Sequence, residues 1–201
     1  MAEAVSGAGG AGRRRRDPEW THWVLVDSLL QLVGEDGEVP TRRQIAERAG
    51  VSERTVFVHF ADRESLYETA ALRQAERWQS LAEPVPSEWP TGRRVDALLR
   101  QRERMYALMA PIRRIGLGLE PRSPALHRVM LDGDRWLRAD LAGVLAPELS
   151  RVAGADTPGG LLDSLDAATS WEAWEHLRER RGLGPDEARQ AVTRTLLALL
   201  R

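Results

Sequence analysis

The segment that begins at Thr41 carries residue types whose spacing suits contact with nucleic acid. Gly50 directly follows one expected helix, where a helix end favours a residue that tolerates φ > 0. Thr41 and Ser52 are typical N-caps, because their side-chain oxygens accept hydrogen bonds from free N–H groups. Two short helices joined by a three-residue turn with glycine form a helix-turn-helix. The spacing therefore predicts helices over Arg42–Ala49 and Glu53–Phe60.

The second of these helices presents Glu53, Arg54 and Thr55 from its first turn, where recognition helices reach base edges. An arginine pairs bidentately with guanine, and a threonine contacts a phosphate or a thymine methyl group. Between residues 41 and 60 four arginines outnumber two glutamates, although the whole chain has a net charge of -1. The segment therefore favours DNA binding. The alternative from spacing alone is a helical hairpin in a core, with Ser52 and Thr55 only as caps.

The run IAERAGVSERTVFVHFADRESL resembles the N-terminal signature of the tetracycline-repressor (TetR) family of regulators. The resemblance implies backbone contacts from Thr41, Thr55, His59 and Arg63, and a base contact from Arg54. Together with the spacing it gives the expected DNA-binding set: Thr41, Arg42, Arg43, Ser52, Glu53, Arg54, Thr55, Phe57, His59 and Arg63.

The sequence departs from the family pattern at two positions of the second helix. Phe57 stands where tyrosine is commoner, so a phenolic hydroxyl contact to phosphate is absent. Val58 stands where a polar or aromatic residue often occurs, which puts another backbone contact in doubt.

Apolar residues recur at helical spacing along nearly the whole chain, which predicts an all-α fold of about nine helices. We expect a disordered basic tail over residues 1–16, a three-helix DNA-binding domain over 17–62, and a helical effector-binding and dimerisation domain over 63–201. The four arginines 13–16 are either a solvated end of the tail or an arm that contacts phosphates or the minor groove.

Helix boundaries are expected at glycines and prolines. A first helix over Trp20–Val33 is expected to be broken by Gly34, Gly37 and Pro40, and a helix that begins near Val95 is expected to end near Pro111. The chain's end is expected to form two helices, about Leu161–Arg181 and Pro185–Arg201.

The resemblance also implies a ligand pocket in the larger domain and a dimer interface on the last two helices. Methionines and aromatic residues suit apolar ligands. The expected pocket residues are Trp89, Met105, Tyr106, Met109, Trp136 and Trp171. Apolar side chains near the end of the chain favour a homodimer, with Trp174, Leu177, Val192, Leu196 and Leu199 at the interface. Each residue in both sets could instead belong to an ordinary core.

Composition excludes several kinds of site. The 201 residues contain no cysteine, so no disulfide, thiolate zinc site or cysteine nucleophile is expected. His127, Asp132 and Asp134 do not share one helix face as metal ligands would. No phosphate-binding or nucleophile motif appears, so we expect no enzyme, no cofactor and no metal. No apolar run approaches the roughly 20 residues of a membrane span, and no signal peptide is evident, so a cytoplasmic protein is expected.

Two functions remain open from the sequence. The favoured one is a dimeric repressor released from its duplex DNA operator by a small, largely apolar ligand. The alternative is a ligand-independent dimeric DNA-binding or architectural protein. An apolar cavity in the larger domain would favour the first, and solid packing there would favour the second.

Overall fold

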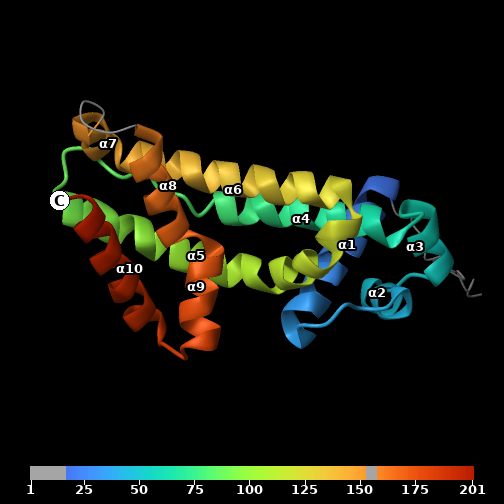
Figure 1. Ribbon diagram of the computed structural model, residues 1–201. Helices are drawn as coiled ribbons and strands as arrows, with labels where there is room; N and C mark the ends of the chain where they lie inside the picture. The colour runs from blue at the N-terminus through green and yellow to red at the C-terminus, as the bar shows by residue number, and fades with distance from the viewer. Residues whose placement is uncertain (1–16, 153–157) are drawn as a thin grey trace, which may run out of the picture.

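The computed structural model describes residues 17–152 and 158–201, which form helices joined by short loops (Figure 1). No strand occurs in those two ranges, and the prediction of an all-α fold is confirmed. The helices are α1 (Pro18–Asp36), α2 (Arg42–Ala49), α3 (Glu53–His59), α4 (Arg63–Gln79), α5 (Thr91–Leu119), α6 (Pro124–Val144), α7 (Ala146–Val152), α8 (Pro158–Thr169), α9 (Trp171–Glu175) and α10 (Pro185–Leu199), with short helical turns η1 (Glu120–Arg122) and η2 (His176–Arg180). Residues 1–16, which include the predicted basic tail and arginines 13–16, lie outside the described residues.

Helix α1 is longer than the sequence suggests. Asp17 caps its start by accepting a hydrogen bond from the Glu19 N–H at 3.0 Å. The helix passes through Gly34 and ends at Gly37, whose φ of 67° lets its N–H donate to the Val33 carbonyl. The prediction that Gly34 ends this helix is wrong, because a glycine inside a helix costs only about 1 kcal/mol. Packing of the preceding turns offsets that cost.

Helix α5 continues through Pro111, so the predicted end near that residue is also wrong. Proline deprives the carbonyl of Ala107 of its helical N–H donor, at a cost of about 3 kcal/mol. Ala107 is exposed, so water can satisfy that carbonyl. Met109 and Ile112 are buried on either side of the proline, and their burial holds the helix together across it.

The expected single helix over Leu161–Arg181 is divided at Ser170. The backbone of Ser170 is extended, with ψ of 157°, and its hydroxyl accepts a hydrogen bond from the Ala173 N–H at 3.1 Å. Ser170 is therefore the N-cap of α9, and a new helix begins there in a different direction (Figure 1). Serine is a strong N-cap, which apolar periodicity alone does not register.

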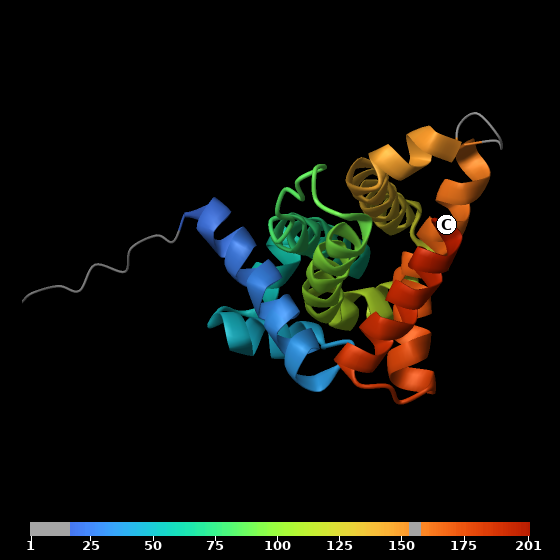
Figure 2. The ribbon, with the colours of Figure 1, turned by 90° about the vertical axis from the view of Figure 1, so that its left-hand side faces the viewer.

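Two apolar clusters make up the core, and α4 contributes to both. Leu66, Tyr67 and Ala70 belong to a cluster with α1, α2, α3 and the end of α5, whereas Trp78 belongs to a cluster with α5, α6, α8, α9 and α10. Figure 1 shows α2 and α3 at one end of the molecule and α7 and α10 towards the other. Figure 2 shows α1 on the side of α4 and α5 away from α8 and α10. No helix within the described ranges is long and apolar enough to cross a membrane.

Candidate functional site

The turn between α2 and α3 has the geometry that its residue types predict. The Thr41 N–H donates to Gln44 Oε1 at 2.8 Å, and the Gln44 N–H donates to Thr41 Oγ1 at 3.3 Å. The two side chains therefore accept hydrogen bonds from each other's backbone N–H groups at the start of α2. Gly50 closes α2 with φ of 64°. Ser52 caps α3 by accepting a hydrogen bond from the Thr55 N–H at 3.1 Å. The predicted helix-turn-helix is confirmed, and α3 ends at His59 rather than Phe60.

The residues expected to contact DNA lie together on α2, α3 and the start of α4. Eight of them are exposed: Thr41, Arg42, Arg43, Ser52, Glu53, Arg54, Phe57 and Arg63. Thr55 and His59 are half-buried, and Val56, on the opposite side of α3, is buried in the core. Together they form a surface at the end of the molecule where Figure 1 shows α2 and α3.

The arginines on and beside this surface differ in whether they form ion pairs within the chain. Arg43 pairs with Glu47 at 2.9 Å, and Arg48 places both terminal nitrogens on the Glu35 carboxylate at 2.8 and 2.6 Å. Glu35 lies on α1, so the second pair fixes α2 against α1. Within the described part of the chain Arg54 forms no ion pair. Its guanidinium is therefore free to meet an acceptor outside the chain.

A ring cluster fixes α3 against α1. The imidazole of His22 stacks on the ring of Phe60, with 4.5 Å between centroids, and lies 6.3 Å from the imidazole of His59. Burial and, secondarily, the neighbouring His59 lower the pKa of His22, while Glu19 opposes this. The neutral form of His22 is therefore favoured in the folded protein.

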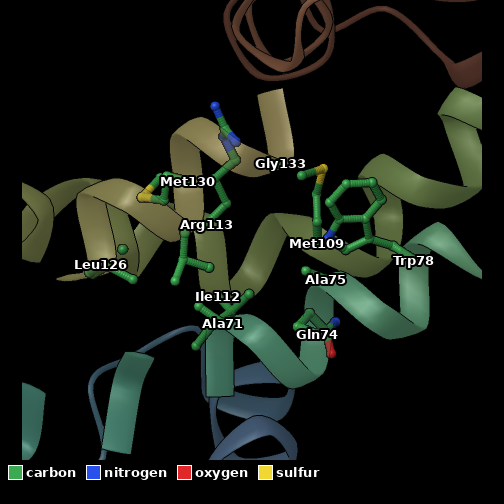
Figure 3. A pocket seen from close by; sticks show the side chains of 12 residues that line it. Ala71, Gln74, Ala75, Trp78, Met109, Ile112, Arg113, Leu126, Met130 and Gly133 are labelled. Carbon is green, nitrogen blue, oxygen red and sulfur yellow. The ribbon is translucent and has the colours of Figure 1, made fainter. Parts of the chain in front are cut away.

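A small cavity of about 40 Å³ lies between α4, α5 and α6 and opens to solvent (Figure 3). We call it the α4–α5–α6 cavity. Most of its lining is apolar or small: Ala71, Ala75, Trp78, Met109, Ile112, Gly116, Leu126, Val129, Met130 and Gly133. Its two polar lining residues are Gln74 and Arg113.

Gln74 and Arg113 were not among the sequence's candidate pocket residues. Gln74 donates from Nε2 to the Leu108 carbonyl at 2.5 Å, which ties α4 to α5. Arg113 is buried and pairs with Asp134 and Glu172, each at 2.9 Å, while its Nε has no hydrogen-bond partner. Gln74 stands at helical spacing from Ala71 and Trp78, which is a signal that sequence reasoning could have used.

Of the expected pocket residues, Met109 lines the α4–α5–α6 cavity. Tyr106 and Trp171 line a neighbouring cavity between α5, α6 and α9, where burial raises the pKa of Tyr106. Trp89, Met105 and Trp136 line neither cavity. Met105 is buried in the core, and Trp136 packs edge-on against Trp78 at 5.4 Å between centroids. Trp89 lies in the loop before α5, where the Arg93 guanidinium covers its ring at 3.6 Å.

The expected dimer residues differ in accessibility. Trp174, Val192 and Leu196 are buried within the single chain, where they belong to the larger apolar cluster. Leu177 is half-buried, and Leu199 is exposed. Leu199, on α10, is therefore the member of this set with the most surface free for a second copy.

Comparison with known proteins agrees with the sequence and with the fold. Residues 32–70 match the family model of bacterial regulatory proteins, tetR family. No curated protein matches the chain. A transcriptional regulator from Rhodococcus sp. Rha1 has a similar structure, with a TM-score of 0.67 and 21% identity over 89% of this chain and 95% of that one. A tetR-family transcriptional regulator from Streptomyces coelicolor has a TM-score of 0.69 and 19% identity over 90% and 80%.

The multidrug binding protein EbrR, solved in complex with imidazole, is also similar, with a TM-score of 0.60 and 21% identity over 87% of this chain and 93% of that one. At these identities the structural likenesses establish the fold. The family model matches the helix-turn-helix segment, and the resemblance stated from the sequence is confirmed.

Proposed function

We propose that the protein is a repressor of the TetR-family type, released from its operator by a small, largely apolar ligand. Residues 32–70 match the model of that family, and the fold is similar to that of its solved members. In this proposal α3 enters the major groove and Arg54 reads a base. Thr41, Thr55, His59 and Arg63 contact the phosphate backbone, and the exposed Arg42 adds positive charge to the same surface.

One observation carries the proposal: α4 lines a cavity at one end and packs under the helix-turn-helix at the other. Gln74, Ala75 and Trp78 face the α4–α5–α6 cavity, whereas Leu66 and Tyr67 belong to the apolar cluster of α1, α2 and α3. A ligand that displaces α4 in the cavity therefore changes the position of the DNA-binding helices. Such coupling needs differential affinity for two positions of α4.

The lining of the cavity supports the choice of ligand. Its walls are mostly apolar, and the charge of Arg113 is already balanced by Asp134 and Glu172. An anionic ligand would meet two carboxylates beside the one cation. An uncharged, largely apolar ligand meets no such cost.

We also propose that the protein acts as a homodimer through the two helical segments at the end of the chain, residues 161–181 and 185–201. Leu199 and the half-buried Leu197 and Leu200 lie at the end of α10. Two copies related by a two-fold axis would present two α3 helices to half-sites about 34–36 Å apart on one face of DNA.

The experiment begins with selection of bound fragments from random duplexes. Pools of small apolar compounds are then added to the complex with the selected duplex, and release is followed by fluorescence anisotropy. Enrichment of one sequence, followed by release with a subset of compounds, supports the proposal. Enrichment without release by any compound favours the alternative, a ligand-independent dimeric DNA-binding or architectural protein. Absence of enrichment contradicts both.

A further inference from the structure

Among the large apolar side chains in the described residues, Val58 is the most exposed, with 70% of its surface accessible. It lies near the end of α3, the second helix of the helix-turn-helix. An apolar side chain that stands out from a short helix gains nothing from folding. An exposed apolar side chain at this position suits contact with a binding partner.

The outward face of α3 is defined by Arg54 and Val58. These residues are four apart, so they lie one above the other on a helix surface. Val56, which points the other way, is buried at 1% exposure in the core below. Whatever contacts Arg54 from outside the chain therefore reaches Val58 as well.

Phe57, the other exposed apolar residue of α3, already has a partner. The guanidinium of Arg42 lies 5.5 Å from its ring centroid, although 55% of the side chain remains exposed. Val58 lies on the adjacent face of α3, one turn after Arg54. On the helix face that carries Arg54, the exposed apolar side chain is that of Val58.

We propose that Val58 packs against the C5-methyl group of a thymine in the major groove and thereby helps to determine the operator sequence. The inference rests on the proposed placement of α3 in that groove. The thymine methyl is the apolar group that base pairs display there. Arg54 shares this helix face, and Arg42 and Arg63, on the neighbouring helices, are also exposed; this positive charge favours DNA over an apolar protein surface as the partner.

The position of the thymine follows from helix geometry. Four residues advance a helix by about 6 Å, and successive base pairs are about 3.4 Å apart. A helix whose Arg54 reads one base therefore brings Val58 to a thymine within about two base pairs of it. This offset is a property of α3 alone and does not depend on the rest of the operator.

The test uses the full-length protein and the duplex selected from random sequences. Each thymine is replaced in turn by deoxyuridine, which differs only by the missing methyl group. For the wild type, replacement at one position per half-site is expected to weaken binding about four-fold, the effect of uncovering one methyl-sized apolar group. Val58→Ala is expected to bind the thymine and the deoxyuridine duplex equally. Val39→Ala removes the same atoms from another exposed valine, outside α3, and is expected to keep the four-fold difference.

The outcomes separate this inference from the proposed function. If no duplex is enriched, the proposed function fails. If a duplex is enriched but Val58→Ala remains as sensitive to deoxyuridine as the wild type, another residue reads the methyl group and the inference is overturned. Equal binding of every deoxyuridine duplex by the wild type also overturns it. Unchanged melting temperatures of both variants exclude unfolding as the cause, because both side chains are on the surface.

Discussion

Asp27 of α1 and Arg77 of α4 form an ion pair in which a carboxylate oxygen lies 2.5 Å from a terminal guanidinium nitrogen. Arg73, one turn earlier on α4, places its Nε 3.6 Å from the same oxygen. Arg77 directly precedes Trp78, which lines the α4–α5–α6 cavity. The same turn of α4 therefore contacts both the first helix of the DNA-binding domain and the proposed ligand site.

Replacing Asp27 with asparagine is expected to lower the free energy of unfolding by about 0.5–1 kcal/mol, the range for partly exposed ion pairs. Urea denaturation measures the change. Asp132→Asn is the matched control, because Asp132 pairs with Arg135 on the same helix and both are well exposed. Equal stability of the two variants would show that the Asp27 pair does not hold α1 to α4.

The pH dependence of stability is expected to report on His22. Because its pKa in the folded protein lies below the ordinary value of 6.5, the unfolded chain binds more protons as the pH falls through that value. The free energy of unfolding should therefore be lower at pH 5.5 than at pH 7.5. His22→Phe keeps a ring against Phe60 but removes the titration, so its stability should depend less on pH. Chemical denaturation at the two pH values tests this, and identical pH dependence in both proteins would refute the role of His22.

Arg54→Ala is expected to weaken binding to the selected duplex by about 1–3 kcal/mol and to relax the preference at one base pair per half-site. Arg43→Ala is the control, because Arg43 lies on the same surface but is paired with Glu47. It should weaken selected and random duplexes to the same small extent. Equal losses on both kinds of duplex for Arg54→Ala would make Arg54 a phosphate contact. Equilibrium titration at fixed salt concentration provides the measurement.

Leu199→Glu is expected to separate the proposed dimer, since it places two carboxylates in one symmetric interface. Light scattering should give twice the mass of one 22.5 kDa chain for the wild type and the mass of one chain for the variant. Leu72→Glu changes another exposed leucine, on α4, and should leave the dimer intact. A wild-type mass of one chain would contradict the dimer itself. Leu196 is unsuited to this test, because it is fully buried in its own chain and a charge there would disturb folding.

Much of the DNA-binding half could be predicted from sequence because its signals are local. Thr41, Gly50 and Ser52 each specify a helix end through their own side chain or backbone freedom, and the structure places the ends of α2 accordingly. The helix end predicted at Pro111 and the helix predicted to continue through Ser170 were wrong for different reasons. Burial on both sides outweighs a proline inside α5, whereas no apolar break accompanies the cap at Ser170.

The cavity was harder to predict than the helix-turn-helix. Methionine and aromatic residues on an amphipathic helix are equally suited to a core and to a pocket. Met109 lines the α4–α5–α6 cavity, whereas Met105, one turn earlier on the same helix, is buried in the core. Which of the two faces an opening depends on how α4 and α6 cross α5, and apolar spacing carries no information on that crossing.

Control of DNA binding from the α4–α5–α6 cavity is tested most directly by the affinity of the protein for its selected duplex. This affinity is measured with and without a saturating concentration of the releasing ligand, for the wild type and for Ala75→Phe. Ala75 lines the α4–α5–α6 cavity from α4, and a phenyl ring would fill part of it. The ligand is expected to weaken DNA binding by the wild type about 5- to 150-fold, the usual range of coupling between sites. Ala75→Phe should bind the duplex but show little further loss when the ligand is added. Release of Ala75→Phe by the same ligand concentration and to the same extent as the wild type would contradict control of DNA binding from this cavity.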